Sequence, residues 1–104
     1  MEIATILNET KTQLQQLYGS RLKGIRLYGS WARDEGTSES DIDLVVILDQ
    51  VTAPGREIEY MIDIITEINL KYNALISVYP VSQADFSALN TPLLINMRRE
   101  SVPA

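Results

Sequence analysis

Two aspartates separated by one residue, Asp41 and Asp43, have the strongest potential for chemistry in this chain. They stand at the beginning of Ile42 to Leu48, an apolar and largely β-branched run typical of a strand buried on both faces. Alternate strand residues point to one face, so both carboxylates project together, about 6.6 Å apart along the chain. Paired carboxylates repel each other and resist desolvation, and a bound cation removes that conflict. The pair therefore predicts a metal site, against the alternative that Asp41 caps a turn and Asp43 is a solvated strand end.

The absence of two residue types narrows the choice of metal. The 104 residues contain neither cysteine nor histidine, so thiolate sites, cysteine nucleophiles and histidine bases are excluded. Acid–base and metal chemistry must be done by carboxylates, which favour a hard, oxygen-binding ion such as Mg²⁺.

A second candidate feature lies shortly before the aspartates, at Gly29-Ser30. Glycine allows a backbone to approach a ligand closely, and Ser30 suits the N-cap of a short helix whose amide groups could donate to phosphate oxygens. Arg33 falls on nearly the same helical face as Ser30 and could contact a phosphate or hold the following loop. Taken alone, the Gly-Ser pair is equally compatible with an ordinary capped turn.

The hydrophobic pattern places both features in an α/β arrangement, with a central sheet of three or four strands and helices packed on it. Pro80 indicates an edge position or a strand end for the last strand, because proline cannot donate to a ladder. The pattern predicts helices over 2–18, 30–33 and 57–72, strands over 24–28, 42–48 and 75–81, a loop over 34–40, a turn over 49–56, a short helix starting near Ser82 and a helical tail over 92–99.

Charge and hydropathy limit the partners. The net charge is −5 and the pI is about 4.6, which disfavours an extended nucleic-acid partner. A small anionic ligand is compatible with that charge, since a few local cations and backbone donors can hold it. The N-terminus lacks a basic start, and no apolar run approaches the ~20 residues of a membrane span, so we expect a cytoplasmic protein.

The two features together resemble a known signature. Gly29-Ser30 and Arg33, followed by Ser40-Asp41 and Asp43-Leu44, are similar to the nucleotidyltransferase signature of the DNA polymerase beta superfamily, most of all to its minimal (MNT-type) members. The resemblance implies one minimal nucleotidyltransferase domain over residues 1–104, with a small mixed β-sheet flanked by helices.

The resemblance also implies a reaction, Mg²⁺-dependent transfer of a nucleoside monophosphate from a nucleoside triphosphate, with ATP as the expected donor. By motif position, Gly29 and Ser30 contact the triphosphate, Arg33 and Ser40 support the site, and Asp41 and Asp43 are the catalytic metal ligands. Minimal members of the family that this chain resembles are often encoded beside a small helical HEPN-domain protein, and some act as antitoxins that attach AMP to it.

One position departs from the family pattern. Active members have a third carboxylate on a later strand, and here the matching position is Ser77. A serine cannot take up a proton near neutral pH, and loss of a positioned base costs on the order of 10²–10⁴ in rate. Either Asp85 or Asp63 supplies the carboxylate, or the acceptor brings its own base, or turnover is poor.

Two hypotheses of different classes follow. The protein is either an enzyme that transfers AMP to a protein hydroxyl, or a catalytically weak module that neutralises a partner by binding. A homodimer or a hetero-complex is compatible with the apolar helix faces of so small a chain. Transfer to a small molecule such as an aminoglycoside ranks last, since drug-modifying relatives need more chain for the acceptor.

Overall fold

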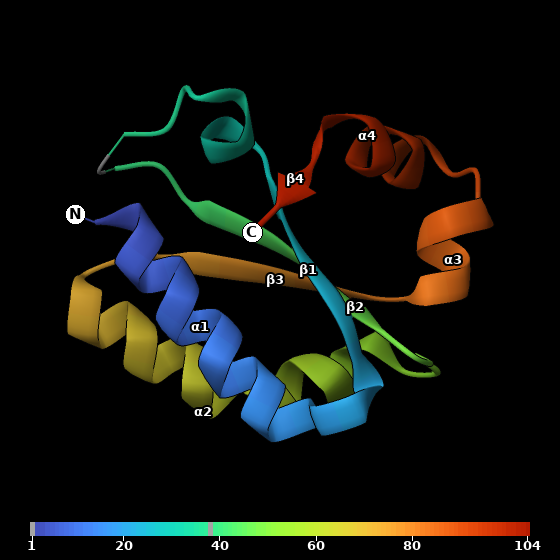
Figure 1. The fold of residues 1–104 in the computed structure, drawn as a ribbon, viewed down its shortest axis with the longest axis horizontal. Helices are drawn as coiled ribbons and strands as arrows, with labels where there is room; N and C mark the ends of the chain where they lie inside the picture. Colours follow the sequence, from blue (N-terminus) through green and yellow to red (C-terminus); the bar gives the residue numbers. More distant parts are fainter. Residues whose placement is uncertain (1, 38) are drawn as a thin grey trace.

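The computed structural model describes residues 2–37 and 39–104 and is built around a four-stranded sheet in the order β3-β2-β1-β4 (Figure 1). Strand β1 (Leu22–Tyr28) pairs antiparallel with β2 (Ile42–Leu48), which pairs in parallel with β3 (Ile76–Ser82). The two-residue strand β4 (Val102–Pro103) lies antiparallel to the end of β1. The sheet is therefore mixed, as the resemblance implies.

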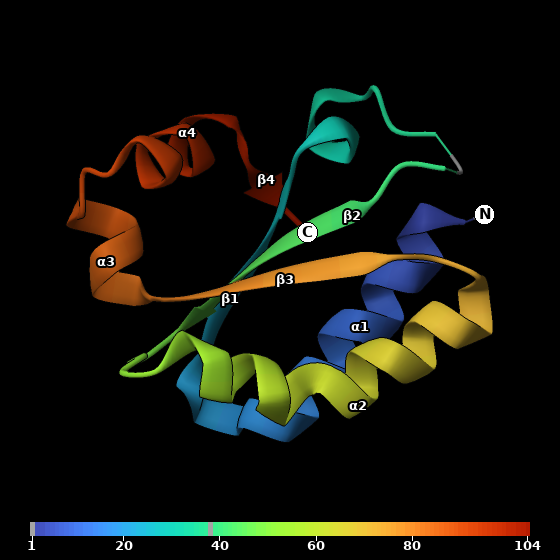
Figure 2. The same ribbon diagram turned by 180° about the vertical axis from the view of Figure 1, so that it is seen from behind.

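Helices cover both faces of the sheet (Figure 2). Helices α1 (Ile3–Tyr18) and α2 (Pro54–Tyr72) lie on one face, and the shorter α3 (Gln83–Ala88) and α4 (Pro92–Glu100) lie on the other. Two short 3-10 helices, η1 (Gly19–Arg21) and η2 (Ser30–Arg33), flank β1. Within the described residues, no helix combines the length and apolarity needed to cross a membrane.

Strand β2 is the centre of the packing because both of its faces are covered. Leu44 and Val46 point into the larger core under α1 and α2, whereas Val45 and Ile47 point into a smaller core under α4. This double burial explains why the strand is an almost continuous apolar run rather than an alternating one. The half-buried Asp43 shares a face with Val45, so its side chain lies on the α3–α4 face of the sheet.

The predicted elements are present, with corrections at their ends. The turn predicted over 49–56 is shorter, because α2 already begins at Pro54, a residue well suited to the first helical turn. The short strand β4 was not predicted. Pro80 does lie on an edge strand, as expected, since β3 is outermost in the sheet.

Candidate functional site

The turn after β1 lies directly against the carboxylate of Asp43. Gly29 has φ 74° and ψ −151°, a conformation essentially restricted to glycine. A Cβ atom at this position would lie 2.5 Å from Oδ2 of Asp43. The strand register explains this proximity, because Tyr28 is paired with Asp43 across β1 and β2. The Gly29 turn and Asp43 are therefore brought together, as the motif requires.

The surroundings of Asp43 disfavour the charged form of its carboxylate. Partial burial raises the pKa of Asp43, and the negative charge of nearby Asp41 raises it further. Asp41 itself is exposed and immediately precedes β2. The destabilised carboxylate of Asp43, with the oxygen donors of Asp41 beside it, fits a hard divalent cation, since a cation favours the charged form of Asp43. The residues present therefore fit Mg²⁺.

Ser77 faces this pair from the neighbouring strand. The parallel register of β2 and β3 places Ser77 opposite Asp43, which is the position expected for a third carboxylate. Among residues 2–37 and 39–104, no group of three potential metal-ligating side chains forms. If a metal binds here, Asp41 and Asp43 are the carboxylates of the described chain that would hold it, with Ser77 opposite Asp43 in the strand register.

The two substitutes suggested for the third carboxylate are wrong. Asp85 lies in the first turn of α3, beyond Ser82 at the end of β3, which is itself about 16 Å along the strand from Ser77. Asp63 is an exposed residue of α2, which covers the opposite face of the sheet (Figure 2). Neither carboxylate can reach Asp43 without rearrangement of the fold.

A cleft of about 350 Å³ opens beside Asp43 on the α3–α4 face. Besides Asp43 and Ser77, its walls include Tyr28, Tyr79 and Met97. These three were not predicted as site residues. Tyr28 and Tyr79 could have been found from strand alternation, since each lies in register near the aspartates, whereas nothing in the sequence distinguishes Met97 from other apolar residues of its helix.

The remaining predicted site residues lie in the loop between β1 and β2. Ser30 is not a helix cap: Gly29 occupies that position, and no side chain caps η2. Arg33 is exposed, and its Nε donates to Oε2 of Glu35 at 3.2 Å. The hydroxyl of Ser40 accepts a hydrogen bond from the Thr37 amide at 3.0 Å. Arg33 and Ser40 therefore shape the loop, and a role for either toward a ligand stays a prediction.

Trp31 fixes this loop to the rest of the fold. Its ring packs against the larger core and lies so close to Gly36 that a Cβ there would overlap the indole. Trp31 is thus a half-buried aromatic at the edge of the larger core.

Comparison with known proteins settles the family. Residues 7–102 match the model of a family described as the nucleotidyltransferase domain. The chain belongs to the nucleotidyltransferase domain family. The motif resemblance is thereby confirmed, and the match extends well beyond residues 29–44, which carry the motif.

Relatives with substantial identity occur in Methanocaldococcus jannaschii. One provisionally named protein adenylyltransferase is 35% identical over 81 residues, covering 78% of this chain and 75% of the relative. Another of the same name is 32% identical over 77 residues, covering 74% and 77% of the two chains.

A solved structure shares the fold of this nucleotidyltransferase-family chain. The crystal structure of a toxin–antitoxin with AMP-PNP superposes with a TM-score of 0.63, covering 90% of this chain and 68% of that chain at 14% identity. The similarity confirms the nucleotidyltransferase fold.

Proposed function

We propose that the protein transfers AMP from ATP to a hydroxyl group of another protein, with Mg²⁺ held by Asp41 and Asp43. The observation that carries the proposal is the contact between the Gly29 turn and Asp43, where an added Cβ would lie 2.5 Å from the carboxylate. Membership of the nucleotidyltransferase domain family and the names of the 35% and 32% identical relatives support adenylyl transfer.

The residues have distinct roles in this proposal. The backbone of Gly29 and the hydroxyl of Ser30 hold the triphosphate at the turn beside Asp43, where glycine permits the close approach. Asp41 and Asp43 would hold Mg²⁺, which would supply a positive charge that offsets the charge of the phosphate groups. The acceptor oxygen forms a bond to the α-phosphorus. The bond from that phosphorus to the oxygen that bridges the α- and β-phosphates breaks, and pyrophosphate leaves.

The acceptor's proton has no carboxylate to receive it opposite Asp43. Ser77 holds the position of the missing base, and Asp63 and Asp85 lie elsewhere in the fold. The proton therefore passes to solvent or to a base that the acceptor protein carries. We expect slow turnover on small hydroxyl compounds and faster turnover on an acceptor that contributes such a base.

A toxin protein of the HEPN type is the acceptor that we propose to test first. The structural neighbour is a toxin–antitoxin with AMP-PNP, which supports both a nucleotide ligand and a protein partner. Transfer of AMP to such a partner would make this chain the antitoxin of the pair.

Transfer of label from α-³²P-ATP tests the proposed activity. The wild type is incubated with Mg²⁺ and the protein encoded by the adjacent gene, beside Asp43→Asn and the matched variant Asp49→Asn. Asp49 lies at the far end of β2 and pairs with Arg21, so this control removes an equal charge away from the cleft. Incorporation by the wild type and Asp49→Asn, but not by Asp43→Asn, is expected; equal incorporation by all three would refute the proposal.

The second candidate is a partner-binding module with little or no catalysis. The specific observation that favours it is Ser77, which leaves the site without a third carboxylate. Silencing of the partner by the Asp41→Asn/Asp43→Asn double variant, without label transfer, would support this candidate. Loss of silencing in a variant that still folds and still binds the partner would eliminate it.

A further inference from the structure

The outer edge of β1 is only partly covered. Strand β4 pairs with β1 at Leu27 and Arg26, in the antiparallel register Leu27–Val102 and Arg26–Pro103. Figure 1 shows β4 beside the upper part of β1 only. Over 22–24, the described residues place no strand on this side of β1.

A groove follows this uncovered edge. It has a volume of about 570 Å³ and lies between α1, which contributes Lys11 and Gln15, and the beginning of β1, which contributes Leu22, Lys23 and Ile25. Strand β4 points toward the groove. Because β4 is antiparallel to β1, an extended segment in line with it beyond Pro103 would lie beside Ile25 and then beside residues 24 to 22. The groove is thus placed to accept one more short strand.

Ala104 already shows this mode of binding. The amide of Ala104 donates to the carbonyl oxygen of Ile25 at 3.1 Å, so pairing extends one residue beyond β4. Nζ of Lys11 donates to the main-chain oxygen of Ala104 at 2.8 Å. An extended segment at this edge therefore exchanges hydrogen bonds with both β1 and α1.

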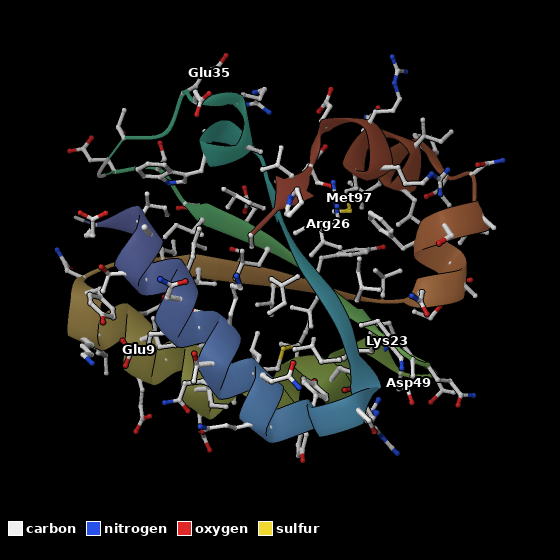
Figure 3. The ribbon with its side chains drawn as sticks, viewed as in Figure 1. Glu9, Lys23, Arg26, Glu35, Asp49 and Met97 are labelled. Carbon is white, nitrogen blue, oxygen red and sulfur yellow. The ribbon has the colours of Figure 1, made fainter. Side chains whose placement is uncertain are left out.

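The charge of the groove indicates which segment fits. Lys11 and Lys23 line it and no carboxylate does, although the chain as a whole has a net charge of −5. Asp49 lies close enough to Lys23 for the lysine charge to influence the pKa of Asp49, and Figure 3 shows the two residues near one another. Because Asp49 forms an ion pair with Arg21, its carboxylate does not pair with Lys23 alone, and Lys23 can still attract an acidic ligand.

We propose that this groove binds an extended peptide segment with acidic side chains, which adds a strand to β1 in line with β4. Backbone hydrogen bonds to the edge would supply part of the affinity, and Lys11 and Lys23 would select acidic side chains. The register shift between Leu22 and Gly24 limits pairing to about three or four residues, or roughly 10–13 Å of strand. The site is separate from the Asp43 cleft and does not depend on the proposed AMP transfer.

A fluorescein-labelled octapeptide of alternating glutamate and valine is the probe, and its binding is followed by fluorescence polarisation. We expect saturable binding that weakens about tenfold or more in the Lys11→Glu/Lys23→Glu variant, because both selecting charges are reversed. The matched control is Arg56→Glu/Arg99→Glu, which changes the net charge equally at exposed residues outside the groove. This control should leave the affinity within about twofold of the wild type.

Strand addition is tested with the same peptide carrying N-methylated amides at alternate positions, which cannot donate to β1. It should bind at least about tenfold more weakly than the parent peptide. Amide hydrogen exchange at residues 23 and 25 should slow when the parent peptide binds.

Four results would overturn the proposal: no saturable binding, equal loss in the arginine control, equal binding of the N-methylated peptide, or competition by inorganic phosphate at stoichiometric amounts. Self-association that is abolished by the lysine variant, without peptide binding, would instead assign the groove to a second copy of the chain. Far-UV circular dichroism of each variant verifies that the fold is retained.

Discussion

Gly29 combines a restricted backbone conformation with a contact that leaves no room for a side chain. We expect Gly29→Ala to lower the free energy of unfolding by about 1–3 kcal/mol through backbone strain. A further cost of about 0.5–1.5 kcal/mol is expected because the carboxylate of Asp43 must rotate away from the added Cβ. Urea denaturation measures both contributions together.

Gly19 provides the matched control for this prediction. It also has a positive φ, 56°, but a Cβ there would meet no atom within 4 Å. Gly19→Ala should therefore show the backbone cost alone, and the difference between the two variants measures the contact with Asp43. Equal destabilisation by Gly29→Ala and Gly19→Ala would show that the close approach to Asp43 is absent in solution.

In the absence of metal, the ionised carboxylate of Asp43 is expected to destabilise the folded state. Partial burial, followed by the charge of Asp41, raises its pKa, so the folded state binds the Asp43 proton more tightly than the unfolded state does. Stability is consequently lost as the pH rises and Asp43 ionises. In metal-free buffer Asp43→Asn should have a higher Tm than the wild type at pH 7, and this gap should close as the pH falls below about 3.9.

The opposite sign is expected at Asp49, which serves as the control. Desolvation raises the pKa of Asp49, but the opposing effects are larger together. The pKa is lowered by hydrogen bonds from Arg21 and the Gln50 amide and by the charges of Arg21 and Lys23. The ionised form of Asp49 thus stabilises the fold above its ordinary pKa. Thermal melts at pH 7 should show a lower Tm than the wild type for Asp49→Asn and a higher Tm for Asp43→Asn. A lower Tm for both variants would contradict the inference that ionised Asp43 destabilises the fold.

At the scale of the elements, the register of β2 and β3 determines which side chain faces the aspartates. Because Ser77 lies opposite Asp43, Ser77→Asp should create a three-carboxylate site. At a Mg²⁺ concentration ten times the Kd, binding adds about 1.4 kcal/mol. That corresponds to a rise in Tm of about 6–11 °C for a chain of this size.

Differential scanning fluorimetry with and without Mg²⁺ measures this rise. Ser87→Asp is the matched control, since it introduces the same charge at an exposed position of α3 outside the cleft. A Mg²⁺-dependent rise that is no larger in Ser77→Asp than in Ser87→Asp would place Ser77 outside the metal site. Without Mg²⁺, Ser77→Asp should be less stable than the wild type, because three carboxylates repel one another.

Edge strand β3 is protected against pairing with other chains. The amide of Ile42 donates to the carbonyl of Leu75, so by alternation the even-numbered residues of β3 direct their backbone groups outward. Of these, the Ile76 amide donates to Oδ1 of Asn69 and Pro80 has no amide hydrogen. Few donors remain on this edge, which favours the uncovered part of β1 as the position for an added strand.

Sequence periodicity predicted the long elements because burial enforces it. Helix α1 and strand β2 were predicted within a residue of their ends, since each packs an apolar face against the larger core. The beginning of α2 was missed because Pro54 and Gly55 indicate a turn when the tertiary contacts are unknown. Strand β4 has only two residues and no periodicity, so no local pattern could have predicted it.

The candidate site was predictable where it depends on local spacing. Gly29 and Asp43 meet because β1 and β2 form a hairpin-like pair around a short loop, which the motif spacing already implied. Ser77 could be assigned from the family pattern, but the positions of Asp63 and Asp85 could not be, since they depend on which face of the sheet each helix covers. The same is true of Met97, which reaches the cleft from the far end of the chain.

At the scale of the whole molecule, the two faces of the sheet have unequal cores. The face under α1 and α2 holds most of the fully buried side chains, whereas the α3–α4 face holds a smaller cluster of five buried residues: Val45, Ile47, Val81, Leu94 and Met97. The cleft with Asp43 lies on this thinner side. A ligand in this cleft would thus meet the part of the fold that costs least to open.

Unequal cores predict unequal local stability, which hydrogen exchange can measure. Leu94 in α4 and Ile65 in α2 are both almost fully buried, at 2% and 4% exposure, so truncation of either to alanine should cost about 2–5 kcal/mol. In Leu94→Ala the loss of protection should concentrate in α3 and α4, because their contacts with the sheet can open while the larger core stays intact. In Ile65→Ala it should extend to α1, α2 and β2, because that core supports the global fold. Equal loss of β2 protection in both variants would mean that the two faces unfold as one unit and that the cleft can open only when the whole molecule does.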